Sequence, residues 1–132
     1  MKLPPYAQTL GVTVEMVADV PEIVMPFGQH VVGRPGFLQG GAIAGLLEVA
    51  AIAALRHALS GEGARIKPIN ATVDFMRGGR DHVTRAAGEI TRLGSRVATV
   101  TATAWQDDRA RPIASARMNY LIERPSTERS VT

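Results

Sequence analysis

The chain has 132 residues, 45% of them hydrophobic, and this size predicts a single domain over residues 1–132 with one core. It contains no cysteine, which excludes a disulfide framework, a thiol nucleophile and a cysteine-ligated metal, and which is compatible with a cytoplasmic location. The excess of 15 Lys and Arg over 12 Asp and Glu is small and stacking aromatics are scarce, so the composition argues against a nucleic-acid partner.

The first part of the chain predicts two short strands and a loop. Apolar and polar residues alternate from 10 to 16, as in a half-buried strand. A turn is expected at residues 19–21, and a second strand at 22–26. Glycines and a proline then indicate a loop over residues 27–38, which leads to the next element.

Residues 37–55 predict one long helix, which we expect to continue to about Leu59 and to end at residues 60–63. Apolar residues occur on every side of it, so the helix is expected to be covered all round. Glu48 is the only charged residue between 37 and 55. Because an unpaired carboxylate inside such a helix is costly, we expect Glu48 to have either partners or a chemical task.

The same segment approaches the length of a membrane span. Glu48 and the many glycines and alanines make it a poor one, however. Residues 1–5 also lack the apolar run of a signal peptide. We therefore expect neither a signal peptide nor a membrane association.

A glycine pair, Gly40 and Gly41, stands at the start of this helix. The N–H groups of a first helical turn lack intrahelical acceptors and attract negative charge. An acid and N–H donors for an oxyanion are what acyl hydrolysis needs, but Gly40 and Glu48 lie about 12 Å apart along one helix. Two antiparallel copies would bring Glu48 of one chain near Gly40 of the other, which predicts paired sites across a dimer interface.

Four strands are expected after the helix, at residues 69–76, 83–91, 96–105 and 113–122. From Arg124 onward, the polar sequence predicts a frayed tail. One long helix among about six strands, four of them consecutive, implies an α+β domain in which an antiparallel sheet folds over that helix.

The segment at residues 33–42, followed by Glu48, resembles the active-site segment of hotdog-fold acyl-CoA thioesterases of the PaaI-like (phenylacetic acid degradation-related) group. In that family an Asn, a Gly, a His-Gly-Gly and an acid recur at this spacing. Here Gly33 stands at the family's Asn position and Gln39 at its His position. The resemblance covers most of the chain, because it continues through three further segments, residues 70–77, 92–96 and 114–122.

The resemblance implies hydrolysis of acyl-CoA thioesters by a hotdog fold, an antiparallel sheet of about six strands wrapped around the helix. Glu48 would act as general base or nucleophile, and the Gly40 N–H, with Gly41 beside it, would bind the oxyanion. Gln39 is expected to cap the helix or to orient the substrate by a hydrogen bond, because an amide exchanges no proton at neutral pH. The implied assembly is a homodimer within a dimer of dimers. Coenzyme A is part of the substrate, so no separate cofactor is expected.

The resemblance also implies a set of residues that bind the substrate and its coenzyme A moiety: Gly33, Asn70, Met76, Arg77, Arg92, Gly94, Ser95 and Arg96. Gly94 would let the backbone approach the ligand closely. The planar fork of arginine suits phosphate, and we expect Arg77, Arg92 and Arg96 to converge on the phosphates from neighbouring strand ends. No grouping of His, Asp and Glu has the spacing of metal ligands, so no metal site is expected.

Two other functions remain open at this stage. The chain is alternatively a noncatalytic protein that binds or senses acyl-CoA, or a hotdog hydratase or dehydratase. The dehydratase would want a His paired with the acid, and the helix offers no His before His57, which is expected to cap the helix end. Each candidate also has a purely structural interpretation. Glu48 is then a buried acid that is paired across a dimer, the glycine pair allows close packing of helices, and the arginines form a solvated face. His30 and His82 are further candidates to face the site.

Overall fold

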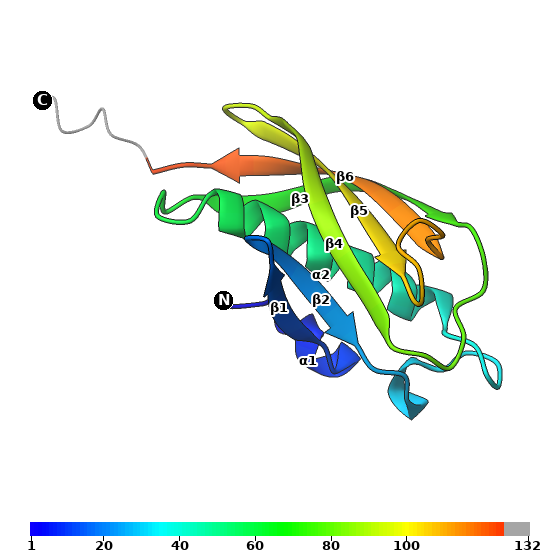
Figure 1. The fold of residues 1–132 in the computed structure, drawn as a ribbon. Helices are drawn as coiled ribbons and strands as arrows, with labels where there is room; N and C mark the ends of the chain where they lie inside the picture. Colours follow the sequence, from blue (N-terminus) through cyan, green and yellow to red (C-terminus); the bar gives the residue numbers. More distant parts are fainter. Residues whose placement is uncertain (126–132) are drawn as a thin grey trace, which may run out of the picture.

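The computed structural model describes residues 1–125, in which one antiparallel sheet surrounds one long helix (Figure 1). The six strands of the sheet lie in the order β1-β2-β4-β5-β6-β3, and the long helix, α2, packs along its inner face. This is the α+β hotdog fold that the sequence predicts. The elements are α1 (Tyr6–Leu10), β1 (Thr13–Val17), β2 (Val20–Met25), the 3-10 helix η1 (Gln29–Val31), α2 (Gly40–Ala58), β3 (Arg65–Phe75), β4 (Thr84–Leu93), β5 (Val97–Trp105) and β6 (Ala114–Glu123).

Small side chains on the inner face of the sheet let it curl closely around α2. A Cβ atom at Gly88 on β4 would lie 2.9 Å from the Cβ of Ala54 and 3.0 Å from the carbonyl oxygen of Ala50. The helix and β4 therefore meet almost backbone to backbone. Several other inner positions of β4, β5 and β6 are also small, because they are occupied by buried alanines: Ala86, Ala98, Ala102, Ala104, Ala114 and Ala116.

Helix α2 begins at Gly40, which confirms the predicted glycine pair in its first turn, although the apolar run had extended the predicted helix to Phe37; it ends at Ala58, close to the predicted end. The apolar residues 37 and 38 belong to the preceding loop instead. The Leu38 N–H donates a hydrogen bond to the carbonyl oxygen of Gly79 at 2.9 Å. Tertiary hydrogen bonding of this loop, which apolar periodicity does not reveal, thus sets the helix start.

Strand boundaries also differ from the prediction: β1 begins at Thr13 rather than at residue 10, because Leu10 ends helix α1. The β1–β2 turn lies at Ala18 and Asp19, which both have positive φ (51° and 64°), and β2 follows directly. Strand β3 begins at Arg65 rather than at residue 69, and its pairing with β6 shifts register after Pro68. A proline inside a strand is typical of a sheet edge, where its missing N–H costs no ladder bond. β3 is such an edge, since only β6 pairs with it in the described sheet.

The expectation that α2 is covered all round is wrong for a single chain. Ala44, Glu48 and Ile52, which follow one another at helical spacing, are only half-buried. The adjacent edge strand β3 exposes most of its side chains, including Ile69 at 51% and Phe75 at 56%. One face of α2 and the strand beside it therefore lack a cover within the described chain.

The other faces of α2 are enclosed by the sheet. The helix is long and apolar enough to span a membrane by composition. In the structure, however, 61% of its apolar window is buried inside the protein. α2 is therefore the buried core helix of the hotdog fold. The predicted tail follows β6, and its residues 126–132 lie outside the described part of the chain.

We predict that Gly88→Ala lowers the free energy of unfolding by about 1–3 kcal/mol, because the added methyl group forces α2 away from β4. Glu89→Ala, at the exposed neighbouring position, should change it by less than about 0.5 kcal/mol. Urea unfolding of the parent and both variants measures these differences. A Gly88→Ala protein as stable as the parent would show that helix and strand are not in contact there.

Candidate active site

A groove of about 570 Å³ runs between the uncovered face of α2 and the edge strand β3. Strand β3 contributes residues 68–71 and Val73 to it, and β6 contributes Met118 and Tyr120. Among the described residues that line the groove, Glu48 alone is charged. Its α2 wall is otherwise made of small residues at helical spacing, and these are Gly41, Ala44 and Gly45.

Glu48 is half-buried in this groove, and its carboxylate is free. Within residues 1–125 it makes no hydrogen bond and no ion pair, in contrast to Glu15 and Glu22, which pair with Arg85 at 2.9 and 3.1 Å. The small residues one and two helical turns before Glu48 do not cover its carboxylate, so a ligand in the groove can reach it. The groove therefore presents an unpaired carboxylate to a ligand or to a second chain.

Tyr120 lies in the same groove, and sequence analysis missed it. Its side chain is 1% exposed, and its hydroxyl donates to the sulfur of Met118 at 3.4 Å. Burial, and secondly the negative charge of Glu48, raise the pKa of Tyr120 above its ordinary value. The signal in the sequence was a tyrosine at an inward position of an alternating strand, since a buried phenol needs a polar partner. The hydroxyl of Tyr120 is thus close enough to Glu48 to sense its charge.

The start of α2 carries the predicted N–H donors. Gln39 occupies the N-cap position, and its Oε1 accepts a hydrogen bond from the Ala42 N–H at 3.2 Å, which confirms its predicted capping role. Within residues 1–125 the N–H groups of Gly40 and Gly41 have no acceptor. A Cβ atom at Gly33 would lie 3.1 Å from the Cα of Gln39, so the two positions that depart from the family pattern are in contact.

The donors and the acid do not meet within one chain. Gly40 and Glu48 belong to the same unbroken helix, so they stay about 12 Å apart. A carbonyl group placed beside Glu48 therefore does not reach the Gly40 N–H of that chain. Gly41 borders the same groove as Glu48, nearer to the helix start.

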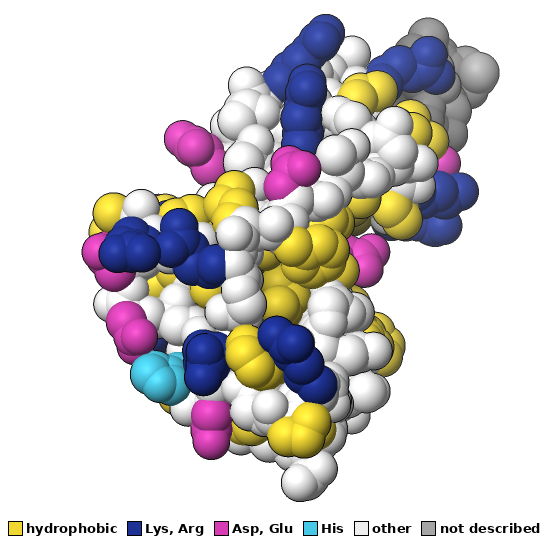
Figure 2. Space-filling model, turned by 90° about the vertical axis from the view of Figure 1, so that its right-hand side faces the viewer, with side chains coloured by type: hydrophobic (Ala, Val, Ile, Leu, Met, Phe, Trp, Pro, Cys, Tyr) yellow, Lys and Arg dark blue, Asp and Glu magenta, His cyan; other side chains and the backbone are white. Residues whose placement is uncertain are grey.

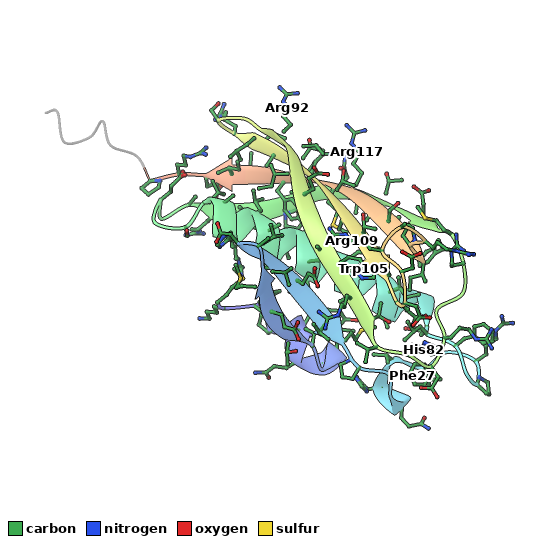
Figure 3. All side chains as sticks on the ribbon, in the orientation of Figure 1. Phe27, His82, Arg92, Trp105, Arg109 and Arg117 are labelled. Atoms are coloured by element: carbon green, nitrogen blue, oxygen red, sulfur yellow. The ribbon has the colours of Figure 1, made fainter. Side chains whose placement is uncertain are left out.

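The expectation that Arg77, Arg92 and Arg96 converge is wrong for a single chain. The Arg77 Nε donates to the carbonyl oxygen of Pro112, just before β6, at 3.0 Å. The carbonyl oxygen of Arg96 accepts from the Ile122 N–H near the end of β6 at 2.7 Å. The length of β6 places these two arginines roughly 30 Å apart. Arg92 projects from the outer face of the sheet, away from α2 and the groove (Figure 3).

Two further predicted residues, Gly94 and Ser95, lie in the β4–β5 hairpin and make contacts within the chain there. A Cβ atom at Gly94 would lie 3.0 Å from the carbonyl oxygen of Val97, which already accepts a hydrogen bond from the Gly94 N–H at 2.9 Å. The carbonyl oxygen of Ser95 accepts a hydrogen bond from Arg124. Glycine at position 94 is therefore required by the tight turn itself, whether or not a ligand approaches it.

The remaining predicted residues are spread around the groove and beyond it. Asn70 lines the groove and accepts a hydrogen bond from Asn119 at 2.8 Å, whereas Met76 is exposed beyond the end of β3. His30 binds the carbonyl oxygen of Leu10 at 2.9 Å, and His82 pairs with Asp107 at 3.1 Å, so neither faces the groove. Within residues 1–125, no three side chains of His, Asp or Glu lie close enough to hold a metal ion.

Basic side chains, with acidic ones among them, are exposed on the face shown in Figure 2, and several of them lie near the start of α2. The guanidinium groups of Arg34 and Arg80 lie 4.0 and 4.5 Å from the ring centre of Phe37, which precedes the helix. Arg77 and Arg80 also border a neighbouring hollow together with Arg111. These arginines come from three different loops, which is why the sequence did not group them.

The chain is similar to known proteins in sequence and in fold. A model of the thioesterase superfamily matches residues 35–113, and no curated protein matches the chain. A solved protein of Chromobacterium violaceum is 33% identical, with a TM-score of 0.71, over 89% of this chain and 82% of the other. A putative thioesterase of Ralstonia eutropha, called a phenylacetic acid degradation-related protein, is 25% identical, with a TM-score of 0.76, over 92% of each chain. A Bacillus halodurans protein solved with CoA is 18% identical over 89% of this chain and 77% of the other, and its TM-score of 0.76 shows a likeness of fold.

We predict that Tyr120→Phe makes the protein less sensitive to alkaline pH. Because the pKa of Tyr120 is raised above 10.0, the folded state keeps a proton that the unfolded chain releases. This contribution to stability is fully present below about pH 10 and is lost as the pH rises above it. Urea unfolding at about pH 8 and about pH 11 should show that the free energy of unfolding falls more between these two pH values in the parent than in the variant. Equal losses in the two proteins would contradict the raised pKa.

Proposed function

The chain belongs to the thioesterase superfamily, and we propose that it hydrolyses acyl-CoA thioesters to a free acid and coenzyme A. The observation that carries this proposal is the free Glu48 carboxylate in a groove of small and apolar side chains. A groove that limits the access of water strengthens the electrostatic effect of such a group. The likeness to the Ralstonia eutropha protein supports a place in the PaaI-like group.

Glu48 is proposed to act as a base or as a nucleophile. As a base, it takes a proton from water, whose oxygen bonds to the thioester carbonyl carbon; the C–S bond then breaks, and the departing thiolate accepts the proton. As a nucleophile, Glu48 forms a mixed anhydride with the acyl group as the thiolate leaves, and water then hydrolyses the anhydride. Both routes require a carboxylate that no side chain of the protein already occupies.

Both routes also place negative charge on the carbonyl oxygen. We assign its stabilisation to the free N–H of Gly40, with Gly41 beside it and Gln39 holding the first turn in place. Because Gly40 lies about 12 Å from Glu48 of the same chain, each site combines Glu48 of one copy with Gly40 of a second. The exposed edge of β3 and the uncovered face of α2 support such a homodimer, and we extend the proposal to a dimer of dimers.

The coenzyme A moiety is proposed to run toward the arginines at the start of α2 in the second copy, which is the copy that supplies Gly40. Arg77 and its neighbours Arg34 and Arg80 supply positive charge there, which suits phosphate. The Bacillus halodurans protein solved with CoA supports a ligand of this class. In an antiparallel dimer, the hairpin that carries Arg96 in one copy approaches the Arg77 end of the other, so these two arginines would meet only between chains.

A noncatalytic protein that binds acyl-CoA is the second candidate. The contact between Gly33 and Gln39 favours it, because these positions offer no group that transfers a proton. For either function we propose a cytoplasmic location, in line with the absence of cysteine. Release of free thiol from a panel of acyl-CoA esters distinguishes the enzyme from the binding protein.

We predict that Glu48→Gln lowers kcat by at least about 100-fold, because the amide keeps the size of the side chain but neither accepts a proton nor attacks a carbonyl. The variant should unfold at the same urea concentration as the parent or a higher one. Glu89→Gln, on the sheet, is the matched control and should keep full activity. Near-normal thiol release by the Glu48→Gln protein would rule out its catalytic role.

The shared site is tested by mixing two inactive chains. Gly40→Val blocks the oxyanion donor, and a Cβ atom at this position meets only the Phe75 ring at 3.7 Å, so the variant should fold. A heterodimer of Gly40→Val with Glu48→Ala contains one intact site and one that is doubly impaired. We predict that mixing after dissociation restores thiol release. Failure to restore it in heterodimers confirmed by mass spectrometry would contradict a site shared between chains.

A further inference from the structure

Tyr6, on the short helix α1, lies across bare backbone at Gly45 of α2. A Cβ atom at Gly45 would lie 2.5 Å from Cε2 of Tyr6 and 3.3 Å from its Cζ and hydroxyl oxygen. No other residue type at position 45 leaves the ring where it is. A glycine in the middle of a helix costs about 1 kcal/mol relative to alanine, and the packing of this ring is a reason to keep it.

The ring is held by an anchored element. Ala7 and Leu10 of α1 are buried, and the helix packs against α2. His30 binds the carbonyl oxygen of Leu10 at 2.9 Å and so ties the end of α1 to the segment that precedes the α2 loop. Tyr6 itself is 46% exposed, because one face of the ring borders open space. The ring is therefore a wall of the groove rather than part of the core.

Tyr6 borders the groove close to Glu48. Gly45 precedes Glu48 by three residues, so the two positions share one face of α2. The side chains of Val73 and Met118, which also line the groove, are apolar. An acyl group whose carbonyl carbon sits at Glu48 would thus extend along apolar side chains and meet the tyrosine ring.

We propose that Tyr6, seated on Gly45, limits the length of the acyl group that the groove accepts, and that the protein prefers short acyl groups over long unbranched chains. This inference rests on the proposed function, since it assigns a substrate class to the same site. Tyr6 acts as a specificity-determining residue and takes no part in bond making or breaking.

The test compares binding of three thioethers that cannot be hydrolysed, S-butyl-, S-octyl- and S-dodecyl-CoA, by calorimetry. The parent should bind the butyl probe more tightly than the dodecyl probe. Tyr6→Ala should shift the ratio of the two dissociation constants by about tenfold toward the long chain. Gly45→Ala, which displaces the ring from the other side, should shift the ratio in the same direction.

Two control variants distinguish the effect of the Tyr6 ring on the groove from a general disturbance of α1. Tyr6→Phe keeps the ring, and Thr9→Ala changes an exposed residue of the same helix, so both should keep the parental ratio. An unchanged ratio in Tyr6→Ala overturns the proposal, and so does a parent that binds none of the three probes.

Thiol release from butyryl-, octanoyl- and dodecanoyl-CoA by the same proteins tests the proposed function separately. If the probes bind with the expected shift but no thiol is released, hydrolysis is wrong and the role of Tyr6 stands. If the parent releases thiol and Tyr6→Ala keeps the parental order of kcat/KM values, the role of Tyr6 is wrong and hydrolysis stands.

Discussion

The contact between α2 and β4 at Gly88 is the constraint on which the rest of the structure depends. A sheet that curls around a helix brings part of its inner face within one small side chain of that helix, so the inner positions nearest to α2 on β4 are glycine and alanine. The large apolar side chains of α2, such as Leu46 and Leu47, then fill the space that the small ones leave. The same closeness fixes the rotation of α2, since only one of its faces fits against β4. Glu48 lies on a different face of the helix, the one that the sheet leaves uncovered.

The uncovered face of α2 follows from this arrangement rather than from a shortage of apolar residues. The described sheet ends at β3, and the short helix α1 reaches only as far as Gly45. Between them the chain leaves a groove in which a carboxylate avoids the full cost of burial and yet lies beside apolar side chains. A fully wet position would weaken the effect of the carboxylate on a substrate, and the half-buried position of Glu48 limits that loss.

The sequence was sufficient to predict those features that depend on composition and on the spacing of apolar residues. The one charge in a long apolar helix identified Glu48, the glycine pair and Gln39 identified the helix start, and alternation identified the strands. Pairing register was not accessible, so Arg77 and Arg96 were expected together although β6 separates them. The groove needs α1, α2, β3 and β6 at once, and for that reason neither Tyr6 nor Tyr120 was identified. Local signals fix which elements form; contacts between distant elements decide which side chains meet.

The composition of β3 bears on how an open sheet edge avoids indiscriminate aggregation. An unpaired strand invites other strands, and natural edges resist this with charges, prolines and bulges. β3 carries Arg65 and Lys67 at its start, a proline and a bulge next to them, and Asp74 near its end. Only the uncharged window of residues 69–73 is left to accept a neighbour. In the proposed homodimer, antiparallel pairing of two copies of this window would bring Asp74 of one chain near the basic start of β3 in the other. The charges that deter unrelated strands would then favour a second copy of this chain.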